Sequence, residues 1–105
     1  MAKREFKTNR IKEIIKNIAD DFRHSSEVGE YALLFYKADT SGMINGSEID
    51  QMLEYVTTGL DELSKNIQWR EEFLQENTGV DEMKMLKNMK TIEEEYIELK
   101  EFLKK

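Results

Sequence analysis

Cysteine and proline are both absent from the 105 residues. Without cysteine the chain has no disulfide framework, no thiolate nucleophile and no cysteine-ligated zinc or iron-sulfur site. Without proline, and with only five glycines, it lacks the residues that frequent tight turns and short strands usually need. These absences predict long helices joined by few loops.

Groups that carry out catalysis or bind metals are also scarce. His24 is the only histidine, and neither a glycine-rich phosphate loop nor a nucleophile elbow is present. Glu93, Glu94 and Glu95 are consecutive, so they point in different directions on a helix. A carboxylate-bound metal pair in a helical bundle would need Glu-x-x-His pairs, which the sequence lacks. We therefore expect no enzyme activity and no cofactor.

Long apolar runs are missing as well: none approaches the ~18 residues that a membrane span needs. The first ten residues carry charge without the apolar stretch of a secretory signal. Hydrophobic residues make up 39% and charged residues 36% of the chain, a balance typical of helices with one buried stripe and a charged outer face. We expect one cytoplasmic helical domain over residues 1 to 105, with no membrane contact.

Two shorter helices are predicted in residues 1 to 45. Apolar side chains recur at three- and four-residue steps between residues 11 and 22, which places them on one face of a helix over residues 8 to 24. Ser25 or Ser26 can cap a second helix that runs to Lys37. The largely apolar residues 31 to 36 cover more than one face of that helix, so we expect them at the centre of the core.

Residues 46 to 105 carry two heptad patterns, one on each side of Asn77, Thr78 and Gly79. The expected seam residues are Ile49, Leu53, Val56, Leu60, Leu63, Ile67 and Leu74 in one helix and Met85, Met89, Ile92, Tyr96, Leu99 and Leu103 in the other. Because about three residues join the two helices, the chain must return beside itself. The fold class predicted is all-α, a three- or four-helix bundle with a long C-terminal antiparallel helical hairpin.

Two features interrupt the first of these seams. Thr57, Thr58 and Gly59 are poor helix formers, so we expect a bend or a close helix contact there. Arg70 occupies a seam position, where a charge is costly unless it reaches solvent or meets a carboxylate.

Trp69 and Phe73 lie four residues apart beside this seam, with Arg70 adjacent. Such a pair can be part of the core, packing against another helix, or it can form a patch that binds a partner, because Trp and Arg are enriched among interface anchors. The candidate partner-binding residues are therefore Trp69, Arg70 and Phe73.

A loop between the second and third predicted helices, residues 37 to 48, has the sequence KADTSGMINGSE. Gly42 fits the sharp turn and Ile44 the apolar position of a calcium loop. Positions that would supply ligands are occupied by Asp39, Ser41, Asn45 and Glu48. This segment resembles a single degenerate EF-hand loop, and the resemblance implies an ion site formed by those four residues.

The first ligand position of this loop holds Lys37, whose ammonium group cannot ligate calcium and would repel it. No second loop of the same pattern is found, so tight calcium binding is not expected. Three interpretations stay open: an ordinary helix-loop-helix corner, a degenerate loop kept for its structure, and a true ion site.

Charge is unevenly distributed along the chain. Residues 1 to 16 hold six basic and two acidic residues, whereas the whole chain has a net charge of −6. The six basic residues are Lys3, Arg4, Lys7, Arg10, Lys12 and Lys16. This basic arm can contact phosphates of nucleic acid or be the solvated face of the first helix.

The absence of catalytic groups, the long seams and the acidic helical faces together predict a protein that works through protein-protein contacts. We expect an inhibitor, adaptor or regulatory subunit that binds a partner with a basic surface, with a homo-oligomer as a second option. The acidic, Lys- and Glu-rich composition resembles that of small proteins of phages and mobile elements, including inhibitors of host defence systems. An ion-responsive EF-hand-like protein and a nucleic-acid binder are the alternatives.

Overall fold

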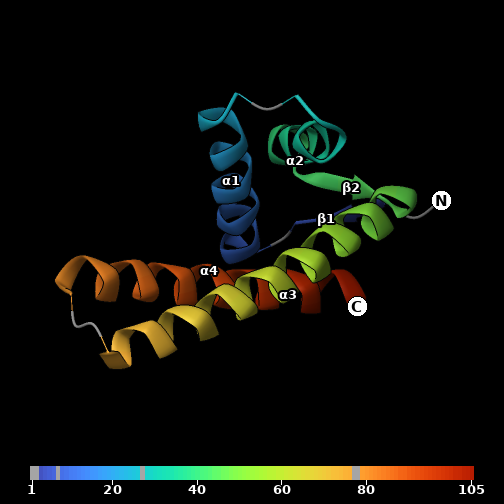
Figure 1. Cartoon of the computed structure of the whole chain (residues 1–105). Helices are drawn as coiled ribbons and strands as arrows, with labels where there is room; N and C mark the ends of the chain where they lie inside the picture. Colours follow the sequence, from blue (N-terminus) through green and yellow to red (C-terminus); the bar gives the residue numbers. More distant parts are fainter. Residues whose placement is uncertain (1–2, 7, 27, 77–78) are drawn as a thin grey trace.

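The computed structural model describes residues 3–6, 8–26, 28–76 and 79–105. Within them the order of elements is β1 (Lys3–Glu5), α1 (Asn9–His24), α2 (Glu30–Ser41), β2 (Met43–Asn45), α3 (Gly46–Glu76) and α4 (Val80–Lys104). The protein is all-α, as predicted, and α3 and α4 form the long antiparallel hairpin (Figure 1). The hairpin sets the longest dimension of the molecule, 52 Å.

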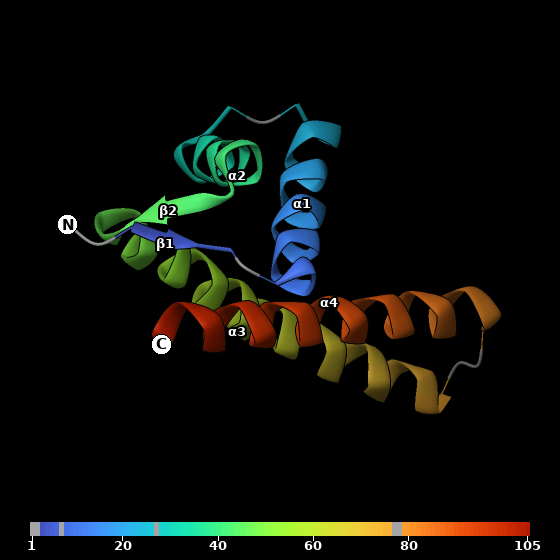
Figure 2. The ribbon, with the colours of Figure 1, turned by 180° about the vertical axis from the view of Figure 1, so that it is seen from behind.

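The helices α1 and α2 stand on one part of the hairpin and leave its tip uncovered (Figure 1; Figure 2 shows the same arrangement from behind). One hydrophobic cluster joins all four helices, and it reaches Leu60 on α3 and Tyr96 on α4. Phe35 of α2 is fully buried in it. Two contacts fix α1 on α4: Arg10 pairs with Glu98 at 2.7 Å, and Asn17 donates to Glu95. The remaining part of the hairpin, residues 63–76 and 80–92, is called the tip half below.

A two-stranded antiparallel ribbon, which the sequence did not predict, ties the N-terminus to the fold. Backbone pairing places Arg4 opposite Ile44, and the amide of Phe6 donates to the carbonyl of Gly42 at 2.9 Å. Phe6 is buried and its ring packs on that of Phe102. Strands of three residues are too short for an alternating pattern to reveal them.

The boundary of α2 differs from the prediction. Ser25 is the C-cap of α1, and its amide and its hydroxyl both donate to the carbonyl of Asp21. The second helix starts at Glu30 after Gly29, which makes no side-chain cap, so the expected Ser25 or Ser26 cap is wrong. It also continues past Lys37 to Ser41. Gly42 ends it with a left-handed backbone (φ 74°) that favours glycine. Asn77 and Thr78, which separate the two predicted heptad patterns, lie outside the described residues.

Near the tip of the hairpin, the face of α4 that packs on α3 is rotated relative to the predicted seam. Leu99 and Leu103 are buried, but Met85 and Ile92 are 46% and 37% exposed. Glu93, one residue beyond Ile92, faces α3 instead and accepts a hydrogen bond from Ser64 at 2.9 Å. An α-helix drifts by ~20° per heptad relative to a strict seven-residue repeat, so two heptads move the contact face toward neighbouring residues.

A close helix contact occurs at Gly59, as predicted. A Cβ atom there would lie 2.8 Å from Cε2 of Tyr96, inside normal contact distance. Glycine therefore lets the tyrosine ring of α4 lie directly against the backbone of α3.

Candidate partner-binding surface

Trp69 and Phe73 lie in the tip half of α3 and face outward rather than into the core. Their rings are stacked, with centroids 5.6 Å apart and an angle of 17° between the planes. Trp69 is 59% exposed and Phe73 38% exposed. Of the two interpretations left open by the sequence, packing in the core does not fit this placement. Binding of a partner by this pair stays a prediction.

Arg70 points to the other helix of the hairpin. Its Nη1 atom lies 2.6 Å from Oε2 of Glu82 near the start of α4. The side chain is only 26% exposed, so it is shielded more than the neighbouring Trp69. The seam charge therefore meets a carboxylate within the same chain, where it joins the two helices. Any contact of Arg70 with a partner would have to compete with this ion pair.

Two exposed apolar residues of α4, Met85 and Ile92, share a side of the hairpin with the Trp69–Phe73 pair. Asn66 of α3 and Ile92 of α4 line one common pocket. Trp69 and Phe73 follow Asn66 at three- and four-residue steps and so share its face, while Met85 shares the face of Ile92 one heptad earlier. We call Trp69, Phe73, Met85 and Ile92 the hairpin strip. The hairpin strip makes this side of the tip half apolar.

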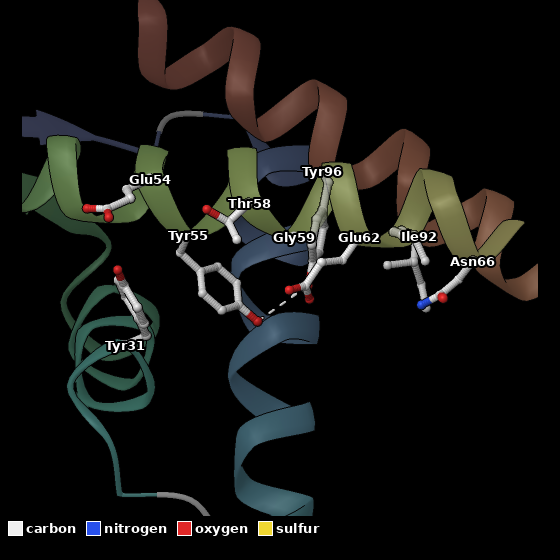
Figure 3. A pocket seen from close by; sticks show the side chains of 10 residues that line it. Tyr31, Glu54, Tyr55, Thr58, Gly59, Glu62, Asn66, Ile92 and Tyr96 are labelled. Carbon is white, nitrogen blue, oxygen red and sulfur yellow. Dashed lines mark hydrogen bonds between the residues drawn. The ribbon is translucent and has the colours of Figure 1, made fainter. Parts of the chain in front are cut away.

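The pocket at the inner end of the hairpin strip has a volume of about 540 Å³. Figure 3 shows its lining. Its walls come from α2, α3 and α4, and its residues are Tyr31, Glu54, Tyr55, Thr58, Gly59, Glu62, Leu63, Asn66, Ile92 and Tyr96. We call it the tyrosine pocket. It lies where α3 and α4 leave the core cluster, next to the exposed tip half.

Three tyrosine rings form the floor of this pocket. The ring of Tyr55 contacts those of Tyr31 and Tyr96, with centroid distances of 5.3 and 6.3 Å. The hydroxyls of Tyr55 and Tyr96 lie 3.5 Å apart. Burial, together with this hydrogen bond, raises the pKa of Tyr96 well above its ordinary value. Tyr96 therefore stays neutral, and the three side chains line the pocket with aromatic faces and hydroxyl groups.

The residues of the EF-hand-like segment are engaged with other groups. Asp39 pairs with Arg23 at 2.9 Å, and Ser41 donates to the carbonyl of Lys37. Glu48 accepts from the amide of Asn45 and from the ammonium of Lys37, each at 3.1 Å. Since α2 runs to Ser41, the first three ligand positions sit two residues apart on one helix and point in different directions. The structure does not bring the four residues together.

The carboxylate of Glu48 is held in its charged form by these contacts. Partial burial alone would raise its pKa, but the hydrogen bonds from Lys37 and from the amide of Asn45 outweigh that effect, so the pKa lies below the ordinary value. The ammonium of Lys37 thus stands beside the carboxylate that would bind calcium in an EF-hand. No group of three His, Asp or Glu side chains in the described residues is placed to hold a metal ion.

Millimolar calcium is therefore expected to leave the stability of the protein unchanged. A ligand that binds only the folded state would raise the unfolding midpoint steadily with its concentration. We expect a change of less than about 1 °C between calcium and chelator in a thermal melt followed by circular dichroism. Magnesium at the same concentration controls for ionic strength. An unfolding midpoint that rises with calcium but not with magnesium would show that the segment binds calcium.

The other sequence candidates occupy ordinary surface positions. His24 is exposed in the last turn of α1. Within the basic arm, Arg10 is paired with Glu98, Lys12 and Lys16 are exposed, and Lys7 lies outside the described residues. A search of the described residues finds no helix long and apolar enough to cross a membrane.

Comparison with known proteins gives no relative: no protein-family model, no curated protein and no solved structure matches this chain. The sequence does not predict the tyrosine pocket, because its lining comes from three helices and three of its members, Leu63, Ile92 and Tyr96, are expected in the hairpin seam.

Proposed function

We propose that this protein binds another protein through the hairpin strip and acts as an inhibitor, adaptor or regulatory subunit. The observation that carries the proposal is the placement of two stacked, exposed aromatic rings, Trp69 and Phe73, on the half of the hairpin that α1 and α2 leave uncovered. Large aromatic residues dominate the energy of protein interfaces, and a contiguous exposed apolar surface commonly marks one.

The charge of the chain favours a partner with a basic surface over a second copy. The net charge is −6. Three exposed acidic residues border the strip, Glu62 and Glu72 on α3 and Asp81 on α4, against one exposed lysine, Lys65, four residues before Trp69. Two copies meeting through this side would bring like charges together, which costs free energy, whereas a basic partner would gain from them and be steered toward the surface.

Trp69→Ala combined with Phe73→Ala is expected to weaken partner binding at least about tenfold, since truncation of buried aromatic anchors costs ~2 kcal/mol or more. The melting temperature should change little, because both side chains are exposed in the free protein. The measurement is affinity capture from the native host with wild type and variant as baits, followed by titration of each captured protein.

Leu33→Ala is the matched control, because Leu33 is another large exposed apolar residue that lies on α2, away from the strip. It should capture the same partner as wild type. Analytical ultracentrifugation of the wild-type protein measures its oligomeric state and so tests the alternative of a homo-oligomer. Should the double variant retain every captured protein, or should the only association lost be that of the chain with itself, the proposed function is wrong.

A further inference from the structure

The tyrosine pocket combines aromatic rings with negative charge and has no positive charge of its own. Of its ten described lining residues, Tyr31, Tyr55 and Tyr96 are aromatic, Glu54 and Glu62 are acidic, and none is basic. Figure 3 shows Glu54 beside Tyr31 at one end of the pocket and Glu62 beside Tyr96 further along α3.

The two carboxylates share one face of α3, because Glu54, Thr58 and Glu62 follow each other at four-residue steps. Neither Glu54 nor Glu62 belongs to any of the six ion pairs among the described residues. Asp21 and Glu95 add further negative charge near Tyr96. The lining of the pocket therefore carries net negative charge, which attracts a cation.

Elsewhere in the same fold, an arginine occupies an arrangement of this kind. The guanidinium of Arg23 lies 5.3 Å from the ring centroid of Tyr36. It also pairs with Asp20 at 2.6 Å and with Asp39 at 2.9 Å. One tyrosine face and two carboxylates of α1 and α2 thus bind one guanidinium. The tyrosine pocket also combines tyrosine faces with carboxylates, with Glu54 and Glu62 eight residues apart along α3.

We propose that the tyrosine pocket binds an arginine side chain of the protein partner. The inference rests on the proposed function and names the chemistry that the partner must present beside the hairpin strip. The planar, weakly hydrated guanidinium stacks on a tyrosine face and donates to carboxylates in a fixed fork, which a lysine ammonium cannot do. The aliphatic stem would pack on Leu63 and on Ile92, which belongs to both the pocket and the strip.

The test is a titration of the isotope-labelled full chain with N-acetyl-arginine amide, followed by amide NMR. The neutral isostere N-acetyl-citrulline amide and N-acetyl-lysine amide serve as comparison ligands. We expect shifts at Gly59 and Glu62 with a dissociation constant on the order of 1 to 10 mM, the range for one side chain in an open pocket. Lysine should bind about threefold more weakly, and citrulline should leave these amides unmoved.

Glu54→Gln with Glu62→Gln removes both charges at almost constant shape and is expected to weaken arginine binding by about three- to tenfold. Glu101→Gln removes one exposed charge outside the pocket and should have no effect. Equal binding of citrulline and arginine, equal binding of lysine, or full binding by the double Gln variant would each overturn the assignment of arginine.

Failure of this inference can be told apart from failure of the proposed function. Arginine amide should still bind the Trp69→Ala, Phe73→Ala variant, because neither residue lines the pocket. If the captured partner is lost with that variant but binds the double Gln variant as tightly as wild type, the hairpin strip stands as an interface and the arginine pocket is wrong.

Discussion

Leu99→Asp is expected to abolish cooperative unfolding, whereas Ile92→Asp, seven residues earlier on the same helix, should leave it almost intact. Leu99 is fully buried in the main cluster, while Ile92 is 37% exposed. An unpaired carboxylate at a fully buried position costs at least ~4 kcal/mol, a large share of the ~5 to 15 kcal/mol that stabilises a domain. The same change at a half-exposed position costs about 1 kcal/mol or less.

Urea denaturation followed by circular dichroism measures both variants under identical conditions. The two positions carry the same heptad label in the sequence, so the pattern alone predicts equal damage. A sigmoidal transition at the wild-type midpoint for Leu99→Asp, or a collapse of the fold with Ile92→Asp, would mean that α4 packs on α3 in a different rotation. Leu99→Ala provides an intermediate cavity-forming change, with an expected cost of ~2 to 5 kcal/mol.

The long elements of this fold are predictable from the sequence because they repeat. The heptads lie on α3 and α4, helices of 31 and 25 residues, and over such lengths a periodic apolar pattern outweighs local exceptions such as Arg70. The same pattern failed at Met85 and Ile92, because a repeat of seven residues does not fix the rotation of a straight helix at its far end. A long helix is therefore easy to predict from its repeat, but the side of the helix that packs in the seam is harder to predict toward its far end.

Features made by contacts between distant segments were not predictable. The ribbon of β1 and β2 joins residues about 40 positions apart, and its three-residue strands carry no period of their own. The tyrosine pocket similarly unites Tyr31, Tyr55 and Tyr96 from three helices. Tyr31 and Tyr96 look like ordinary core in their own segments, and only the arrangement of the three rings beside Glu54 and Glu62 makes a candidate site.

The Trp69–Phe73 pair was partly predictable from the sequence. Its four-residue spacing identified a shared helix face from sequence alone, but core and surface have the same spacing. What decides between them is how far α1 and α2 extend over the hairpin, and the main cluster reaches only Leu60 and Tyr96. Sequence thus located the residues, and tertiary packing decided their exposure.

Gly59→Val is expected to destabilise the protein by about 2 kcal/mol, even though glycine is a poor residue inside a helix. Valine gains a few tenths of a kcal/mol in helix propensity over glycine, but overpacking a close contact costs ~1 to 3 kcal/mol. The added Cβ would meet the ring of Tyr96 at 2.8 Å. That ring is itself partly buried and hydrogen-bonded to Tyr55, so it cannot move aside without loss of its own packing.

A double-mutant cycle isolates this contact. In a Tyr96→Ala background the ring is gone, so Gly59→Val should become neutral or slightly stabilising, and the two changes should couple by about 2 kcal/mol. Thr58→Val controls for the β-branched side chain, because it keeps the shape at an exposed neighbouring position and should stay within ~0.5 kcal/mol of wild type. Free energies of unfolding come from urea titrations of all variants. Equal costs of Gly59→Val with and without the Tyr96 ring would show that the ring does not rest on Gly59, and the floor of the tyrosine pocket would then have to be rebuilt around a different position of α4.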